Sequence, residues 1–236
     1  MLDKPIIFSS PFKGLISEPK PGVQCIPEAY KKMDRYFEKK ETGKNKTVKM
    51  CMPFLDAYST GYIITFPATI GCFYDKEKEQ MNFEFGDSMN QFYREFLNVE
   101  GHNSFQKSDD LKYDKRTVDF IFKFLNPWHI KTPPGYSCIF TTPLNQNRPF
   151  KIVDGIVDTD DYPLNVHFPF YWTGDVTKTY ILEEGSPMVQ VIPFKRESWK
   201  MQTTDENKAS AEETFKWSKF YRDIYKKLVW KKKSYR

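Results

Sequence analysis

Residues 127–199 read PWHIKTPPGYSCIFTTPLNQNRPFKIVDGIVDTDDYPLNVHFPFYWTGDVTKTYILEEGSPMVQVIPFKRESW, and this stretch decides the fold. Its β-branched and aromatic runs, separated by Pro and Gly turn signals, form the best strand pattern in the chain. Polar and apolar residues alternate over Leu164–Phe170, which is typical of a strand with one buried face. We therefore expect residues 127–199 to form the core of a β-rich domain.

Strand signals continue on the N-terminal side of this stretch. Runs of β-branched and aromatic residues at 62–66 and 69–74 are joined across Pro67 and Ala68, and the charged segment 75–80 is typical of a turn. We expect strands at residues 47–52, 62–66, 69–74, 81–85, 118–125, 136–141, 163–170, 179–182 and 188–194.

Three amphipathic helices are expected around the strands. Pro27 suits a first helical turn, apolar residues then recur at helical spacing as far as Phe37, and the ETGKNK segment at 41–46 ends that helix. A second helix is expected over residues 87–97 and a third over residues 211–230. The aromatic stripe of the third helix either packs on the body or binds a partner subunit or an acidic surface.

These elements indicate an α+β, β-rich fold. We expect a jelly-roll or β-clip-like barrel with an N-terminal arm and a C-terminal amphipathic helix. The arm covers residues 1–26, where prolines interrupt regular structure, and the β-rich domain covers residues 27–201 with its barrel core at 127–199. A linker and the C-terminal helix occupy residues 202–236.

Composition narrows the classes of protein to consider. The 236 residues suffice for one large domain with a substantial core, and the 17% aromatic share favours strands. The formal charge of +5 is smaller than the excess typical of nucleic-acid binders. Four cysteines without zinc spacing, no signal peptide and no membrane-length apolar segment predict a soluble, cytoplasmic protein, in the host cytoplasm or the virion if phage-encoded.

Four aspartates lie close together: Asp154, Asp158, Asp160 and Asp161. Carboxylates at this density suit a hard cation such as Mg²⁺, or a general base that activates water. The alternative is a solvated turn between strands, where aspartate is favoured because its side chain bonds to the nearby backbone. The sequence leaves both interpretations open.

Three motifs in order resemble those of trimeric dUTPases and dCTP deaminases: TPPGY at 132–136, GIVDTDDY at 155–162 and EGSPMVQVI at 184–192. The resemblance implies a β-clip or jelly-roll-like barrel. It places Asp158 at the water-activating aspartate and Tyr162 near the tyrosine under the deoxyribose. Gly185 and Gln190 keep the family's glycine-to-glutamine interval. If the chain is an enzyme, the resemblance thus implies Asp158, Tyr162 and Gln190 as catalytic residues. In that case the density of carboxylates points to Mg²⁺ as cofactor, with Asp158, Asp160 and Asp161 as its ligands.

The chain departs from that family where phosphates are held. The Arg-Ser-Gly segment should fall near Thr141–Asn145, which reads TTPLN and supplies neither the arginine nor the glycine. One residue is inserted between Asp158 and Tyr162, and Pro163 replaces the arginine-glycine that normally follows. The C-terminal glycine-rich segment is also missing. The resemblance therefore implies that the chain retains the barrel fold of the family but lacks its triphosphate-binding residues.

Taken whole, the chain resembles an uncharacterised family found in bacteria and large tailed phages. The segments that carry this resemblance are TVKMCMPFLDAYSTGYII at 47–64, PPGYS at 133–137 and VIPFKRESW at 191–199. It implies a phage or bacterial origin and no particular mechanism.

Three functions follow from these observations. We favour a non-catalytic binding or assembly module that forms a homo-oligomer or binds a protein partner, because a barrel without a phosphate cradle but with flanking extensions suits oligomeric packing. The alternative is a Mg²⁺-dependent nucleotide hydrolase or deaminase-like enzyme acting on a small polar ligand. A third is a cupin-like metal oxygenase using His129 and His167. No P-loop or dinucleotide-binding motif is present in the chain.

Overall fold

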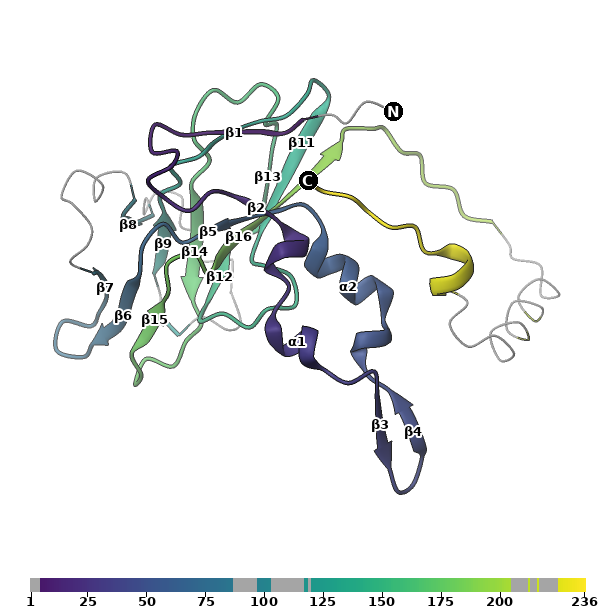
Figure 1. The fold of residues 1–236 in the computed structure, drawn as a ribbon. Helices are drawn as coiled ribbons and strands as arrows, with labels where there is room; N and C mark the ends of the chain where they lie inside the picture. Colours follow the sequence, from purple (N-terminus) through teal and green to yellow (C-terminus); the bar gives the residue numbers. More distant parts are fainter. Residues whose placement is uncertain are drawn as a thin grey trace.

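The computed structural model describes residues 5–86, 97–102, 117–118, 120–204, 212, 216 and 225–236. Within them the protein is a β-rich α+β fold, with sixteen strands arranged in five sheets and a few short helical segments (Figure 1). The helical segments are η1 (Gly22–Cys25), α1 (Glu28–Lys32), η2 (Val48–Met50), α2 (Met52–Ser59) and η4 (Tyr225–Val229). The strands are β1 (Ile7–Ser9), β2 (Lys20–Pro21), β3 (Tyr36–Lys39), β4 (Gly43–Lys46), β5 (Tyr62–Thr65), β6 (Ile70–Asp75), β7 (Gln80–Phe85), β8 (Val99–Gly101), β9 (Ile121–Phe124), β10 (His129–Lys131), β11 (Tyr136–Thr141), β12 (Phe150–Ile152), β13 (Gly155–Val157), β14 (Phe168–Trp172), β15 (Tyr180–Leu182) and β16 (Pro187–Lys195).

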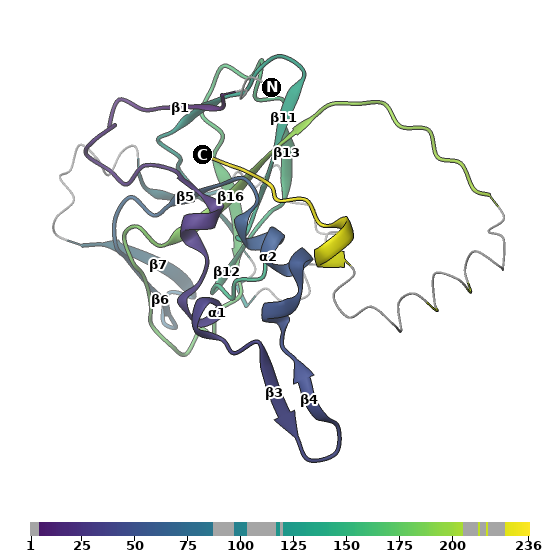
Figure 2. The ribbon, with the colours of Figure 1, turned by 45° about the vertical axis from the view of Figure 1, so that its right-hand side comes forward.

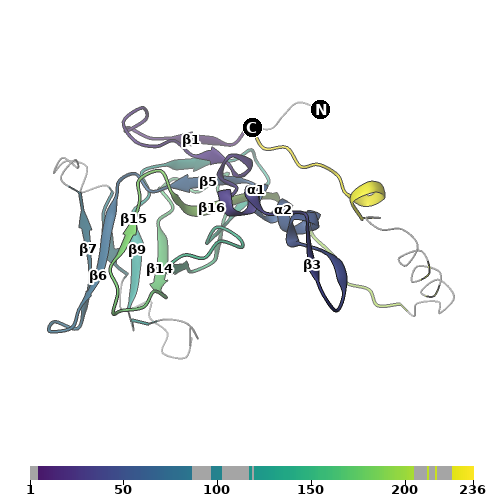
Figure 3. The ribbon, with the colours of Figure 1, turned by 60° about the horizontal axis from the view of Figure 1, so that its bottom comes forward.

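Three antiparallel sheets make the body. The largest has the order β13-β11-β16-β5-β2, the second β12-β14-β9-β8 and the third β15-β6-β7. In Figure 3 the second and third sheets lie at one side of the molecule, and α1, α2 and the β3–β4 hairpin lie at the other. The described strands form open sheets, and no closed barrel is found among them.

Two chain segments pass together from the largest sheet to the third sheet. β5 pairs with β16 and β6 pairs with β15, so the residues between them change sheets side by side. At this crossing Phe66 donates its N–H to Ser186 (2.9 Å) and accepts the N–H of Gly185 (2.8 Å). Gly185 has φ +73°, a left-handed conformation that favours glycine. The expected strands at 62–66 and 69–74 are thus confirmed, but they belong to different sheets.

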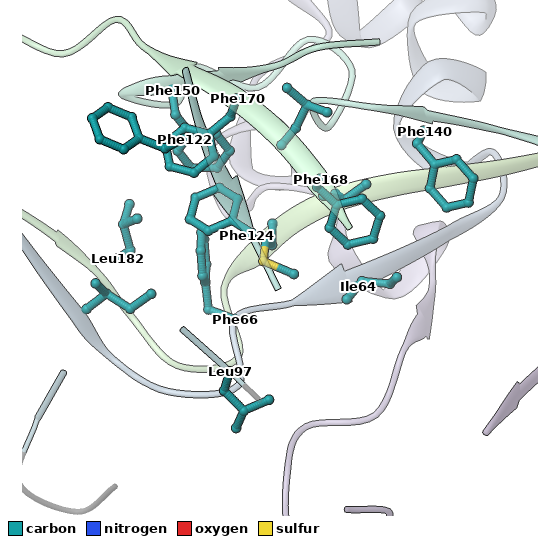
Figure 4. Packing of buried hydrophobic residues seen from close by; sticks show 14 of the residues in the cluster. Ile64, Phe66, Leu97, Phe122, Phe124, Phe140, Phe150, Phe168, Phe170 and Leu182 are labelled. Carbon is teal, nitrogen blue, oxygen red and sulfur yellow. The ribbon is translucent and has the colours of Figure 1, made fainter. Parts of the chain in front are cut away.

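The core is a cluster of aromatic rings between the sheets (Figure 4). Phe170 of β14 is fully buried and stacks on Phe124 of β9, with ring centroids 3.8 Å apart. Phe66 and Phe150 meet Phe124 edge-on at 5.2 Å each. Because these rings come from the second sheet and from the crossing at Phe66, they join the sheets into one core.

The expected helix after Pro27 is wrong over most of its length. Only α1 is helical, and the chain then forms the β3–β4 hairpin, where Tyr36 and Phe37 are exposed. Gly43 takes φ +64° at the start of β4. Aromatic residues suit strands, and their spacing alone did not distinguish a helical stripe from a hairpin.

The expected strand at 47–52 is also wrong. The chain there forms η2 and the first residue of α2, and Pro53 lies in the first turn of α2. Proline is tolerated in that turn because the first N–H groups of a helix have no intrahelical partner. The α2 helix buries Met52 and Tyr58 against the body.

The remaining expected strands fare differently. Those at 81–85, 136–141, 179–182 and 188–194 are confirmed by β7, β11, β15 and β16, and the one at 118–125 is the shorter β9. The one at 163–170 is only partly right, because β14 begins at Phe168. The expected helix at 87–97 lies outside the described residues except for Leu97. Of the expected helix at 211–230, residues 212, 216 and 225–230 are described, and η4 is a π-type turn. No helix in the described ranges is long and apolar enough to span a membrane.

Candidate functional site

The four aspartates are divided by the short strand β13. Asp154 precedes this strand and Asp158 follows it, while β13 pairs antiparallel with β11. Asp154 accepts hydrogen bonds from Thr141 Oγ1 (2.6 Å) and from Lys151 Nζ (3.0 Å). Asp158 accepts a hydrogen bond from Ser137 Oγ (2.6 Å) at the other end of β11. Asp154 therefore lies apart from Asp158, Asp160 and Asp161.

Asp160 is held by groups from three parts of the chain. The Arg196 guanidinium donates to both carboxylate oxygens, at 2.7 Å for Nη1 to Oδ1, and the Gly135 N–H donates to Oδ2 at 2.7 Å. Lys131 Nζ donates to the Asp160 carbonyl (2.6 Å). We call these four residues the Asp160 clamp. Hydrogen bonds from Arg196 and then from Gly135 lower the pKa of Asp160 to about 2.

The clamp joins the Pro-Pro-Gly turn to the end of β16. Gly135 belongs to that turn, with φ +83°, and the Arg196 N–H donates back to its carbonyl (2.9 Å). Beneath it, buried Thr159 shares a hydrogen bond with Thr132 (2.8 Å). The Asp158 carbonyl accepts the N–H groups of the two residues at 161 and 162 (3.1 and 3.0 Å). Residues 158–162 therefore form a tight turn that hydrogen bonds hold against the Pro-Pro-Gly turn.

Asp158 and Asp160 have different surroundings although they are two residues apart. The side chain of Asp160 is 8% exposed, and that of Asp158 is 66% exposed, with Oδ1 lying 3.2 Å from Arg196. Hydrogen bonding to Asp160, and then charge attraction to both aspartates, raises the pKa of Arg196. Of the two carboxylates, Asp158 is the one that a solute can reach.

Gln190 is buried in β16 and makes three hydrogen bonds within the protein. Its Oε1 accepts the Leu144 N–H (2.8 Å), and its Nε2 donates to the carbonyls of Ala57 (2.9 Å) and Thr60 (2.7 Å). It thus ties the end of α2 to the loop after β11. Gln190 pairs with Thr141, four residues from Ser137 along β11, or about 13 Å at the rise of a strand.

The remaining predicted site residues are also scattered, and they do not form one site with Asp158 or with Gln190. Tyr162 is partly exposed at the end of the aspartate turn. His167 lies before β14, where its Nδ1 accepts the Asn126 N–H (3.0 Å) and burial lowers its pKa. His129 lies in β10. Among the residues that the structure describes, no group of three or more His, Cys, Asp or Glu side chains could hold a metal ion. The magnesium ligands and the histidine metal site stay predictions.

Sequence reasoning missed Arg148 and Arg196. Arg196 lies 36 residues after Asp160, and Arg148 lies in the loop between β11 and β12 beside a cavity of about 720 Å³. Neither belongs to a motif that predicts a partner. For Arg196 the only signal was its place in VIPFKRESW, directly after the last strand.

The Asp160 clamp predicts a pH-dependent contribution to stability. The folded-state pKa of about 2 lies below the ordinary 3.8, so the stabilisation is present above pH 4 and is lost as the pH falls towards 2. We expect Asp160→Asn to lower the thermal unfolding midpoint at pH 7, and the difference from the wild type to vanish near pH 2. Asp161→Asn is the matched control and should change the midpoint little at either pH. Equal midpoints for the wild type and Asp160→Asn at pH 7 would contradict the clamp.

Comparison of the chain with protein-family models, with curated proteins and with solved structures gave no match in any of the three. The resemblance to the dUTPase and dCTP deaminase families stays a prediction from three short motifs, as does the resemblance to the bacterial and phage family.

Proposed function

We propose that the protein is a non-catalytic binding or assembly module, of phage or bacterial origin, whose copies associate with one another. The observation that carries this proposal is the extended segment 196–204, which leaves the body after β16 (Figure 2). Trp199 and Met201 in this segment are 87% and 88% exposed. Burial of side chains of this size stabilises a complex by about 1.5–3 kcal/mol each, so their exposure favours a neighbouring chain that covers them.

A second projection supports the same proposal. The β3–β4 hairpin extends beyond α1 and α2 (Figure 1). It carries the side chains of Tyr36 and Phe37, which are exposed. Its two strands pair only with each other among the described strands. An isolated two-stranded hairpin is marginally stable in water, so contact with a second copy of the chain would stabilise it. The finer architecture that we propose is a jelly-roll or β-clip-like body that carries these extensions.

Two of the candidate site residues, the catalytic candidate Gln190 and the metal-ligand candidate Asp160, also fit a non-catalytic role. Gln190 uses both ends of its amide within the protein, and both oxygens of Asp160 accept hydrogen bonds from Arg196. Groups committed in this way connect strands and turns, and they are not offered to a substrate. In this proposal the motifs shared with the nucleotide enzymes serve the fold.

The test is the mass of the protein in solution. Light scattering after size-exclusion chromatography should give a defined multiple of 28.0 kDa for the wild type. A variant with both Trp199→Ser and Met201→Ser should dissociate with a dissociation constant raised about a hundredfold or more. Leu164→Ser, which also replaces an exposed apolar side chain by serine but on the body, is the control and should keep the oligomer. A wild type that stays monomeric at all concentrations overturns the proposal.

One observation favours the alternative enzyme. Asp158 remains 66% exposed, and Ser137 and Arg196 hold its Oδ1 in place, as a water-activating carboxylate requires. This alternative expects release of pyrophosphate or ammonia from a deoxynucleoside triphosphate with Mg²⁺. That activity should be lost in Asp158→Asn, and activity that Asp158→Asn leaves unchanged removes the mechanism.

A further inference from the structure

A cavity of about 720 Å³ lies between the loop that joins β11 to β12 and the segment that joins β14 to β15. Arg148 lines it from the first loop, and the strand residues that line it include Lys151 of β12, its cross-strand partner Tyr171 of β14, and Tyr180 of β15. The lining contains two cations and no carboxylate, and of the two cations Lys151 is paired with Asp154 (3.0 Å). The positive charge of Arg148 in this lining therefore favours a ligand with negative charge.

Backbone contacts hold the two walls of this cavity in place. The N–H groups of Thr173 and Gly174 both donate to the Pro149 carbonyl, at 2.8 and 2.9 Å. A Cβ on Gly174 would lie 2.9 Å from Trp172 Nε1 and 3.0 Å from Pro149 Cβ, so only glycine fits this approach. The cavity is thus preformed in the protein, as ligand sites usually are.

Arg148 is a half-buried cation without an anionic partner among the described residues. One terminal nitrogen donates to Ser186 Oγ (3.2 Å) and to the Pro187 carbonyl. Its Nε is buried with no hydrogen-bond partner in the described part of the chain, and burial lowers the pKa of the guanidinium. Buried charges are usually paired, because removing an ion from water is costly.

Aromatic rings set the position of the guanidinium. Its central carbon lies 6.0 Å from the ring centroid of Phe66 and 5.7 Å from that of Phe150. Both rings belong to the hydrophobic core, so rigid neighbours hold the charged group beside the cavity. A planar guanidinium in a fixed place matches the geometry of carboxylate and phosphate oxygens.

We propose that this cavity binds a small organic anion, whose carboxylate or phosphate group is received by Arg148 and whose body lies against Tyr171 and Tyr180. The anion supplies the negative charge that the described residues around Arg148 lack. This site is separate from residues 196–204 and does not depend on the proposed assembly.

The experiment measures the thermal unfolding midpoint at constant ionic strength with three probes of similar size: phenyl phosphate, benzoate and the neutral benzamide. At a hundredfold excess over its dissociation constant, an anionic probe should raise the midpoint of the wild type by about 5 °C. Benzamide should leave the midpoint unchanged. The comparison of phenyl phosphate with benzoate then distinguishes a phosphate site from a carboxylate site.

The decisive variant is Arg148→Met, which keeps an unbranched side chain over Phe66 and Phe150 and removes the charge. Without a probe its midpoint should equal or exceed that of the wild type, because a cation without an anion is removed from the cavity wall. With phenyl phosphate or benzoate the shift should disappear. Lys178→Met, at an exposed lysine, is the control and should keep the full shift.

Two results would overturn the proposal: no shift of the wild type with either anion, or the same shift in Arg148→Met. If Arg148→Met does not fold, Arg148→Lys serves in its place. It keeps the charge but loses the planar fork, and it should reduce the shift at least threefold, whereas a shift equal to that of the wild type would also refute the assignment.

Discussion

Replacing Gly61 by alanine is expected to destabilise the protein by about 3 kcal/mol or more. Gly61 joins α2 to β5 and has φ +67°. A Cβ at this position would lie 2.1 Å from the Val191 carbonyl oxygen and 3.0 Å from the carbonyl carbon, both backbone atoms of β16. Backbone in the middle of a sheet cannot give way as a side chain can, so the strands or the joint must shift.

Gly43→Ala is the matched control for this prediction. Gly43 has φ +64°, close to that of Gly61, but nothing lies within 4 Å of a Cβ built there. It should therefore show the backbone cost alone, about 1 kcal/mol. Urea denaturation of both variants gives the two free energies of unfolding. Equal losses would mean that the approach of Gly61 to β16 has no energetic consequence.

The second large effect is expected for Phe170→Ala, at about 3–5 kcal/mol of the free energy of unfolding. Phe170 is fully buried in β14 and stacks on Phe124. It also meets the rings of Phe122 and Phe150 at 5.7 and 5.8 Å (Figure 4). The ring of Phe83 lies 6.0 Å away. Truncation leaves a cavity at the centre of the aromatic cluster, and the surrounding strands can collapse into it only in part.

Phe120→Ala is the corresponding control for the core. Phe120 is 45% exposed just before β9 and contacts Phe122 with ring centroids 5.2 Å apart. Its truncation should cost about 1 kcal/mol or less, since much of the ring already faces water. Denaturant midpoints measured at equal protein concentration separate the two variants. A smaller loss for Phe170→Ala than for Phe120→Ala would show that the aromatic cluster does not carry the stability of the body.

Local sequence patterns predicted much of the fold. The strands β5, β6, β11 and β16 were predicted because each contains at least three β-branched or aromatic residues within four to nine positions. The short strands β12 and β13 were missed, because three residues rarely carry a clear pattern. Two other errors came from apolar spacing that suits more than one element, as at Tyr36 and Phe37, which pair in a hairpin.

The sequence predicted several residues of the candidate site, but it did not predict how they are arranged. The motif order predicted that Asp158 and Gln190 belong to one site, but the register of β11 with β16 sets them apart. The spacing of the aspartates predicted a cluster, but β13 divides it. Arg196 could not be predicted as the partner of Asp160, because the contact depends on where β16 ends relative to the Pro-Pro-Gly turn.

By itself, the sequence determined that the chain is β-rich, where the longer strands run, and that no P-loop or dinucleotide-binding motif is present. Only the tertiary structure decided which strands share a sheet, which carboxylate faces solvent and where an arginine lacks an anion. The physical reason is that strand identity depends on local propensity and the period of the side chains, whereas ion pairing and burial depend on contacts between residues far apart in the chain. In this protein the fold brings Arg196, after β16, against Asp160, after β13. It places Arg148 away from every acidic residue that the structure describes.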